Sequence, residues 1–232
     1  MSNYRNIINP EVVEYITSLY RSVNEDFGRF RAEAEADRVP IILPDTESLI
    51  LNLLRIMKPQ RILEIGTAVG YSASCFAAVC DADITTVEVK EETAGIARAN
   101  IDRFGFSERI EVLCGDGEEI VNNLDMQYDF VFIDAAKSHY RRFWDAALKH
   151  CSKGAVIVSD NVLFKARVVS DKYDETGKYK TNIRRMREFV EYITNVDYAD
   201  TALLPVGDGV ANQRSTKSVS RIASVVSRQR SI

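Results

Sequence analysis

No stretch of this sequence approaches the ~20 apolar residues that a transmembrane helix needs, and its first ten residues lack the charged-then-apolar pattern of a secretory signal. Proline and glycine are also scarce, with 5 and 11 among 232 residues, while hydrophobic residues make up 46%. This composition disfavours disorder over most of the length. We therefore expect a cytoplasmic protein without a membrane partner, built on one large α/β domain.

Cysteine and histidine are too few, and too poorly spaced, for a zinc site or a disulfide framework. The four cysteines form no CxxC pair and lie in apolar stretches: Cys75, Cys80, Cys114 and Cys151. The two histidines, His139 and His150, have no second His or Cys at ligand spacing. We expect buried thiols and a solvated loop position for His139.

Positive charge is scarce over most of the chain. The whole sequence has 30 basic and 34 acidic residues, a net charge of −4. Residues 212–232 hold five of the basic residues and no acidic one, so residues 1–211 carry 25 basic and 34 acidic residues, a net of −9. This charge excludes a generic nucleic-acid binder. Any polyanion would have to meet a local basic patch.

Two patterns divide the chain. Apolar residues at helical spacing over residues 10–58, interrupted by Pro40 and Pro44, predict a helical N-terminal cap. Short β-type runs then alternate with helical segments. The expected strands are Arg61–Ile65, Ile84–Val89, Ile110–Leu113, Tyr128–Asp134, Ala155–Ser159 and Ala202–Pro205. The expected helices are Tyr71–Cys80, Glu91–Phe104, Glu118–Asn123, Tyr140–Cys151 and Asn182–Ile193. This alternation predicts a mainly parallel sheet with helices on both faces and ligands at the carboxyl ends of its strands.

A tight turn is expected after the first strand, where Gly66 and Gly70 lie four residues apart. Glycine at such a turn lets backbone amides approach a ligand. The GxxxG spacing differs from the GxGxxG of dinucleotide-binding proteins and disfavours a nicotinamide enzyme. An ordinary strand-to-helix turn would also explain both glycines.

Two acidic residues follow the next strands. Glu88 lies 22 residues after Gly66, where a carboxylate can accept both hydroxyls of an adenosine ribose. Asp116 follows the third strand and could accept the adenine amino group. Acidic residues at strand ends are also often solvated or cap helices.

A stronger signal follows the fourth and fifth strands. Asp134 ends one, and Asp160 and Asn161 end the next, so adjacent parallel strands would place three hard oxygen ligands side by side. Lys137 would lie close by, where a neighbouring cation favours the neutral amine and makes it a plausible base. The alternative is that Asp160 caps a helix and Lys137 lies at the surface.

These residues carry a family resemblance. Through EIGTAVGYS, TVEV, FIDAAKSHY, SDNVLF and PVGDG, residues 61–211 resemble the cation-dependent O-methyltransferases, which include caffeoyl-CoA and catechol O-methyltransferases. Within that family, DNVLFKARV and YKTNIRRMREF are most similar to bacterial tRNA 5-hydroxyuridine methyltransferases. The resemblance implies a Rossmann-like class I fold with a seven-stranded, mainly parallel sheet. It also implies S-adenosylmethionine as donor, Mg²⁺ or another divalent cation such as Mn²⁺ or Ca²⁺, and a homodimer.

The resemblance also assigns roles by position. It makes Glu64, Gly66 and Ser72 ligands of the methionine end, Glu88 of the ribose and Asp116 of the adenine. It adds three further residues to the cofactor site: Ile42, Thr67 and Asp134. The metal ligands are Asp134, Asp160 and Asn161, and the base is Lys137.

The chain departs from the family pattern near its end. Members usually continue from GDG into a last strand, whereas here Val210 and Ala211 give way to Asn212-Gln213-Arg214-Ser215. We therefore expect a shortened or rebuilt closing strand. The predicted domain is 1–211, with a cap over 1–58 and a core over 59–211, followed by a peripheral basic Ser- and Arg-rich tail over 212–232.

Three functions remain open. Residues 165–187 carry eight basic and three acidic residues in an otherwise acidic chain, which favours an RNA backbone and hence methylation of 5-hydroxyuridine in a tRNA anticodon region. The alternative is a small catechol-type phenol or a caffeoyl-CoA-like ester, with the basic segment an ordinary solvated face. A catalytically silent adenosylmethionine-binding protein is disfavoured by the complete set of Asp134, Lys137, Asp160 and Asn161.

Overall fold

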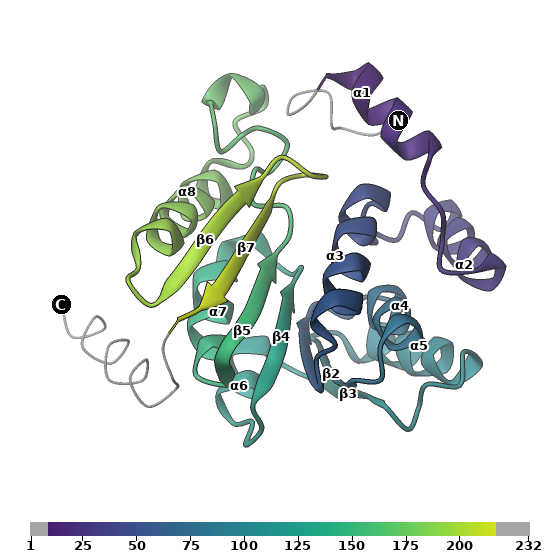
Figure 1. Ribbon diagram of the computed structural model, residues 1–232. Helices are drawn as coiled ribbons and strands as arrows, with labels where there is room; N and C mark the ends of the chain where they lie inside the picture. The colour runs from purple at the N-terminus through teal and green to yellow at the C-terminus, as the bar shows by residue number, and fades with distance from the viewer. Residues whose placement is uncertain (1–8, 217–232) are drawn as a thin grey trace.

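The computed structural model describes residues 9–216 as a seven-stranded sheet covered by helices on both faces (Figure 1). The strand order is β3-β2-β1-β4-β5-β7-β6. The strands are β1 (Arg61–Ile65), β2 (Asp83–Glu88), β3 (Ile110–Cys114), β4 (Tyr128–Ile133), β5 (Cys151–Ser159), β6 (Ala199–Leu204) and β7 (Val210–Ser215). Strands β1 to β5 are parallel, and β7 runs antiparallel to both of its neighbours. The predicted mainly parallel, Rossmann-like sheet is confirmed.

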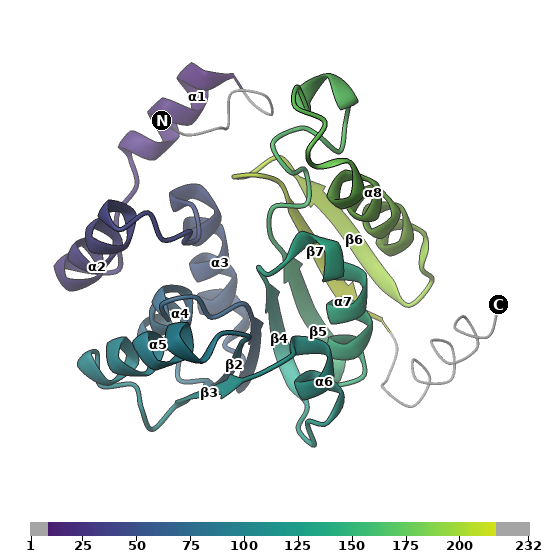
Figure 2. The ribbon, with the colours of Figure 1, turned by 180° about the vertical axis from the view of Figure 1, so that it is seen from behind.

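Eight α-helices and two 3-10 turns are described between residues 9 and 216. They are α1 (Pro10–Ser18), α2 (Glu25–Ala36), α3 (Pro44–Met57), α4 (Tyr71–Val79), α5 (Glu91–Arg103), α6 (Gly117–Asn122), η2 (Lys137–His139), α7 (Tyr140–Leu148), η3 (Asp171–Tyr173) and α8 (Lys180–Asn195). Figures 1 and 2 show α3, α4 and α5 on one side of the sheet and α6, α7 and α8 on the other. None of these helices is both long and apolar enough to span a membrane.

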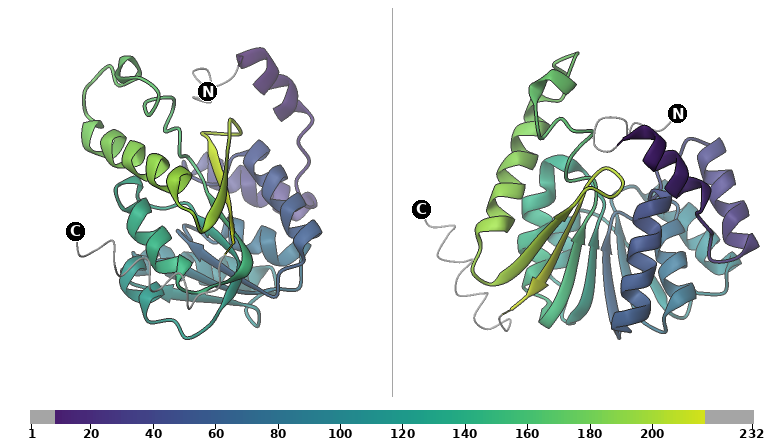
Figure 3. Two further views of the ribbon diagram at one scale, coloured as in Figure 1. Left: turned by 60° about the vertical axis from the view of Figure 1, so that its left-hand side comes forward. Right: turned by 45° about the horizontal axis from the view of Figure 1, so that its top comes forward.

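The central strands are apolar on both faces, which gives the protein two cores. On β4, Phe130 and Phe132 join the core under α3 and α4, while Val131 and Ile133 join the core under α7 and α8. This split follows from the two-residue side-chain period of a strand. Fully burying one such side chain contributes about 1.5–3 kcal/mol. Figure 3 shows the sheet between its two helical layers.

The strand register brings the segments that follow β1, β2, β4 and β5 to one edge of the sheet. Ile65, the last residue of β1, pairs with Val87 on one side and Ile133 on the other, and Ile133 pairs with Ser159 at the end of β5. The residues that follow these strands therefore lie next to one another. The predicted placement of ligand-binding residues at this edge depends on that alignment.

The expectation that the closing strand is shortened and that a peripheral tail begins at residue 212 is wrong for residues 212–215. β7 runs from Val210 to Ser215 between β5 and β6, so a domain boundary after Ala211 would cut through the sheet. Gln213, which is 1% exposed, pairs with Ile157 on one side and Thr201 on the other. Residues 212–215 are polar, so the sequence pattern gave no indication of a strand. In the structure, pairing with the two neighbouring strands holds them in the sheet despite their low strand propensity. The remainder of the predicted tail, residues 217–232, lies outside the described residues, as do residues 1–8 of the predicted cap.

Candidate active site

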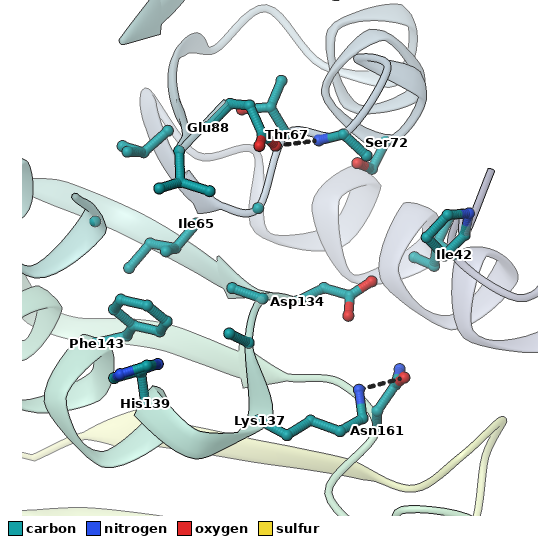
Figure 4. A pocket seen from close by; sticks show the side chains of 18 of the residues that line it. Ile42, Ile65, Thr67, Ser72, Glu88, Asp134, Lys137, His139, Phe143 and Asn161 are labelled. Carbon is teal, nitrogen blue, oxygen red and sulfur yellow. Dashed lines mark hydrogen bonds between the residues drawn. The ribbon is translucent and has the colours of Figure 1, made fainter. Parts of the chain in front are cut away.

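A cavity of about 740 Å³ lies at the carboxyl ends of the strands. Figure 4 shows side chains from the N-terminal cap and from the turns after the strands directed toward it. The structure brings nine of the predicted site residues into its lining: Ile42, Gly66, Thr67, Ser72, Glu88, Asp116, Asp134, Lys137 and Asn161. The other two, Glu64 and Asp160, are fully buried behind it. One cavity thus collects residues from positions 42 to 161.

The two glycines of the first turn are required by the fold itself. A Cβ on Gly66 would lie 2.1 Å from the backbone oxygen of Asp134, because the ends of β1 and β4 approach closely there. Gly66 also has a φ of +108°, and Gly70, at the start of α4, has a φ of +80° with the Ala97 carbonyl 3.2 Å from an added Cβ. The structural explanation of this GxxxG motif therefore holds, and the turn it creates forms one wall of the cavity.

Glu64 does not reach the cavity in this structure. Its two carboxylate oxygens accept hydrogen bonds from Ser72 and Thr86, each at 2.5 Å. Burial raises the pKa of Glu64 to about 7 despite these two donors. In the observed arrangement Glu64 orients Ser72, and Ser72 lines the cavity, while the contact of Glu64 with a methionine group stays a prediction.

Glu88 and Asp116 border the cavity and also organise the backbone. One carboxylate oxygen of Glu88 accepts from the Ala68 amide at 3.0 Å, and the other accepts from the Lys90 amide at 3.1 Å. Asp116 caps α6 by accepting from the Glu119 amide at 3.0 Å. The capping alternative is thus present at Asp116, alongside its place in the cavity lining.

Asp134, Asp160 and Asn161 lie on neighbouring chain turns. The Asp134 amide donates to Ile65 O and the Asp160 amide to Ile133 O, each at 3.0 Å, which continues the parallel ladder beyond the strands. Asp160 Oδ1 accepts from the Asn161 amide at 2.7 Å. Asp160 Oδ2 is buried and has no hydrogen-bond partner within residues 9–216. Burial raises the pKa of both carboxyls, and the charge of Asp134 adds to the increase at Asp160.

This donor set fits a divalent cation. The described part of the chain contains no cluster of three or more His, Cys, Asp or Glu side chains suited to a metal. The set instead consists of two carboxylates and one amide oxygen, the hard oxygen ligands that Mg²⁺, Mn²⁺ and Ca²⁺ take. Two neighbouring carboxylates repel one another unless a cation or a proton compensates them, and the buried, unpaired Asp160 Oδ2 is one site for that compensation.

Lys137 lies beside the oxygen set. Its Nζ donates to Asn161 Oδ1 at 3.0 Å (Figure 4). The same nitrogen lies 5.8 Å from the centre of the Phe164 ring. The alternative of an exposed surface lysine is wrong, because the side chain is partly buried and lines the cavity. His139 is likewise half-buried, 5.9 Å from the Phe143 ring, rather than in a solvated loop.

Asp208 also lines the cavity, although the sequence pattern marked only the turn that contains it. This side chain is 7% exposed, and burial raises its pKa to about 6. Its Oδ1 accepts from the backbone amide of Lys165. In the sequence, Asp208 stands between Gly207 and Gly209, which predicts a turn. This pattern does not indicate that the turn folds back over the site.

Four arginines of residues 165–187 make contacts within the fold. Arg187 donates to Val168 O at 2.7 Å and pairs with Asp171, while Arg184 pairs with Glu188. Arg185 donates to Ser138 O at 3.1 Å, and Arg167 lies over the Tyr179 ring at 4.6 Å. These contacts hold the segment in place and leave less of its charge for a polyanion than the sequence implied.

Comparison with known proteins gives consistent matches. A family model described as O-methyltransferase matches residues 25–216. A caffeoyl-CoA O-methyltransferase of Stellaria longipes is 26% identical over 204 residues, covering 84% of this chain and 85% of the relative. A catechol O-methyltransferase of Niastella koreensis is 30% identical over 149 residues, covering 61% and 67%. A solved O-methyltransferase from Bacillus cereus in complex with SAH is 27% identical, with a TM-score of 0.75 and coverage of 88% and 97%.

Proposed function

The chain belongs to the O-methyltransferase family and is an S-adenosylmethionine-dependent enzyme, and we propose that it methylates one of two neighbouring hydroxyls on a small phenol or a phenolic acyl-CoA ester. The names of its relatives favour this acceptor class, since they include caffeoyl-CoA and catechol O-methyltransferases. Because these relatives are enzymes and the predicted catalytic set is complete, the silent binding protein is the weakest of the three readings.

One observation carries the proposal. Apart from Glu64 and Asp160, which are buried behind the wall, the residues assigned to the donor and those assigned to the acceptor line a single cavity of about 740 Å³. Cavities of this size bind a ligand or two of drug size. A nucleoside-sized donor and a single phenolic ring would fill it, with the remainder of an acyl-CoA ester leaving through its open side. The two reacting groups would then be held next to one another, which removes much of the entropic barrier to transfer.

The donor half lies over the turn after β1. Ser72 is oriented by Glu64, and Glu88 is held by two backbone amides, so both side chains are fixed before a ligand arrives. Glu88 would bind the ribose hydroxyls, and Asp116 would bind the adenine amino group at the far end of the same wall. Adenosylmethionine supplies a methyl group on a positively charged sulfur, an electrophile that needs no further activation by the protein.

The acceptor half lies over the turns after β4 and β5. Asp134, Asp160 and Asn161 would hold a divalent cation, which when bound orients two vicinal oxygens and lowers the pKa of the acceptor hydroxyl. Lys137, 3.0 Å from Asn161 Oδ1, would take the hydroxyl proton on Nζ. Asp208 lies at the same end of the cavity, where its buried carboxyl can accept from or donate to the second hydroxyl.

The tRNA acceptor and the homodimer stay predictions. The relatives reported above are named for small phenolic substrates, and the arginines of residues 165–187 have partners inside the protein. A catechol and a 5-hydroxyuridine both offer two neighbouring oxygens, so the oxygen set alone does not separate them. A side-by-side assay of the acceptors distinguishes them.

The experiment compares acceptors with one enzyme preparation. Purified protein would receive methyl-labelled adenosylmethionine and Mg²⁺ with catechol, caffeoyl-CoA, or tRNA that carries 5-hydroxyuridine, and the label in each product would be counted. We expect methylation of the phenolic acceptors. Transfer to tRNA at a kcat/KM at least tenfold above that of either phenolic acceptor would overturn the proposal.

A charge-reversal variant provides a second measurement. Lys178, Lys180 and Arg184 would be replaced by Glu together, which reverses charge at the surface without touching the cavity lining or the Arg185–Ser138 contact. Because phosphate contacts depend on positive charge, this change should abolish tRNA modification if tRNA is the acceptor. Under our proposal, turnover of catechol by the variant stays within about threefold of wild type.

A further inference from the structure

A buried ion pair lies behind the cavity wall, outside the residues so far given a role. Arg31 on α2 and Glu47 on α3 pair at 2.6 Å, and their side chains are only 9% and 1% exposed. Burying two charges is costly unless the remaining donors and acceptors are also satisfied. The stability of this pair therefore depends on its other partners.

Those partners are numerous. Arg31 donates from one guanidinium nitrogen to Ile42 O at 2.8 Å and from another to Glu35 at 3.0 Å. Glu47 accepts from the hydroxyls of Tyr20 at 2.7 Å and Tyr71 at 2.9 Å. The guanidinium carbon of Arg31 also lies 5.0 Å from the centre of the Tyr71 ring. A planar fork of five donors suits such a cluster better than the point charge of a lysine.

The cluster reaches the cavity lining at two points. Ile42, whose carbonyl Arg31 holds, is a lining residue on the same side of the cavity as Ser72 (Figure 4). Tyr71, whose hydroxyl Glu47 holds, is the first residue of α4 and directly precedes Ser72. Arg31 and Glu47 therefore connect two parts of the cavity lining, Ile42 and Tyr71, that lie far apart in the sequence.

A second contact fixes the same segment from the other side. Asp45, at the start of α3, accepts from the Gly207 amide at 2.8 Å, within the turn that carries Asp208. In Figure 3 the β6–β7 turn lies at the same end of the sheet as the N-terminal helices. The chain from Ile42 to Glu47 is thus held by Arg31 at one end, by Tyr71 at the other and by the Gly207 turn between them.

From this geometry we infer that Arg31 is a positioning residue for the methyl donor: by holding the Ile42 carbonyl and Glu47 together, it fixes the Pro40–Leu43 segment as a preformed wall of the donor site. The inference rests on the proposal that Ile42 contacts adenosylmethionine. Arg31 itself touches neither donor nor acceptor. Its loss should therefore weaken donor binding while leaving transfer at saturating donor little changed.

The test uses three variants of the full chain. Arg31→Lys keeps a positive charge beside Glu47 but cannot hold Ile42, Glu35 and Glu47 at once. The double variant Arg31→Met with Glu47→Leu removes both charges, so neither is left buried and unpaired. Arg29→Lys is the matched control, since Arg29 lies on the same helix and pairs with Asp26 at the surface.

Donor affinity is measured by calorimetry without acceptor, and kcat is measured at saturating donor with catechol. We expect the Kd for adenosylmethionine to rise ~10-fold or more in Arg31→Lys and in the double variant, with kcat within about twofold of wild type. The Arg29→Lys control should match wild type in both measurements.

Two results would overturn the inference. In one, Arg31→Lys lowers the melting temperature but leaves the Kd for adenosylmethionine unchanged, which would make the ion pair purely structural. In the other, the double variant folds, as judged by circular dichroism, and binds the donor like wild type. Because the binding assay contains no acceptor, failure of the phenolic acceptor would leave this measurement unaffected.

Discussion

The buried carboxyl of Glu64 should make the stability of this protein depend on pH. Glu64 is 0% exposed, and burial raises its pKa from an ordinary 4.5 to about 7. The folded state therefore binds this proton more tightly than the unfolded chain does. The contribution to stability is fully present below pH 4.5 and is lost as the pH rises through 7.

The size of the effect follows from the shift. A difference of one pKa unit corresponds to about 1.4 kcal/mol, so this shift is worth on the order of 3 kcal/mol. Glu64→Gln removes the titration but keeps a side chain of the same shape, and the Ser72 and Thr86 hydroxyls can rotate to meet an amide. Relative to the variant, wild type should lose about 3 kcal/mol of unfolding free energy between pH 4.5 and pH 8.

Urea unfolding at half-unit pH intervals would measure the difference between wild type and Glu64→Gln. Glu92→Gln, at an exposed position on α5, serves as the control variant. If the difference between wild type and Glu64→Gln is flat from pH 4.5 to 8, the carboxyl does not titrate in this range, and the argument from burial is refuted.

Three further outcomes are expected. Asp160→Asn should abolish turnover while calorimetry still detects adenosylmethionine, because the oxygen set and the donor wall are separate; near-normal activity of this variant in chelator-treated buffer would exclude the metal mechanism. Lys137→Ala should slow single-turnover methyl transfer by ~10²-fold or more, as for loss of a positioned general base; an unchanged rate at neutral pH would make Lys137 a bystander. Truncation after Ala211 removes four residues of β7 and should prevent folding, monitored by circular dichroism; a folded, active product would show that the sheet does not need them.

The sequence alone was sufficient for the parallel part of the fold. Short apolar runs separated by helical segments gave β1 to β4 to within one residue, because a buried strand needs apolar side chains. The predicted Ala155–Ser159 gave the end of β5 but missed its first four residues, which begin at Cys151. The same pattern placed Asp134, Asp160 and Asn161 at one edge, since adjacent parallel strands end together. These features depend on periods of two and 3.6 residues, which can be read locally.

The tertiary structure alone decided the features that depend on distant partners. Gln213 belongs to β7 because β5 and β6 flank it, and Asp208 reaches the cavity because its turn folds back over the site. Glu64 lies behind Ser72, and Arg31 reaches the Ile42 carbonyl, through contacts between separate elements. A local sequence pattern predicts which face of a helix or strand a side chain lies on. The pKa and the role of a buried polar group depend instead on partners that only the folded chain brings within hydrogen-bond distance.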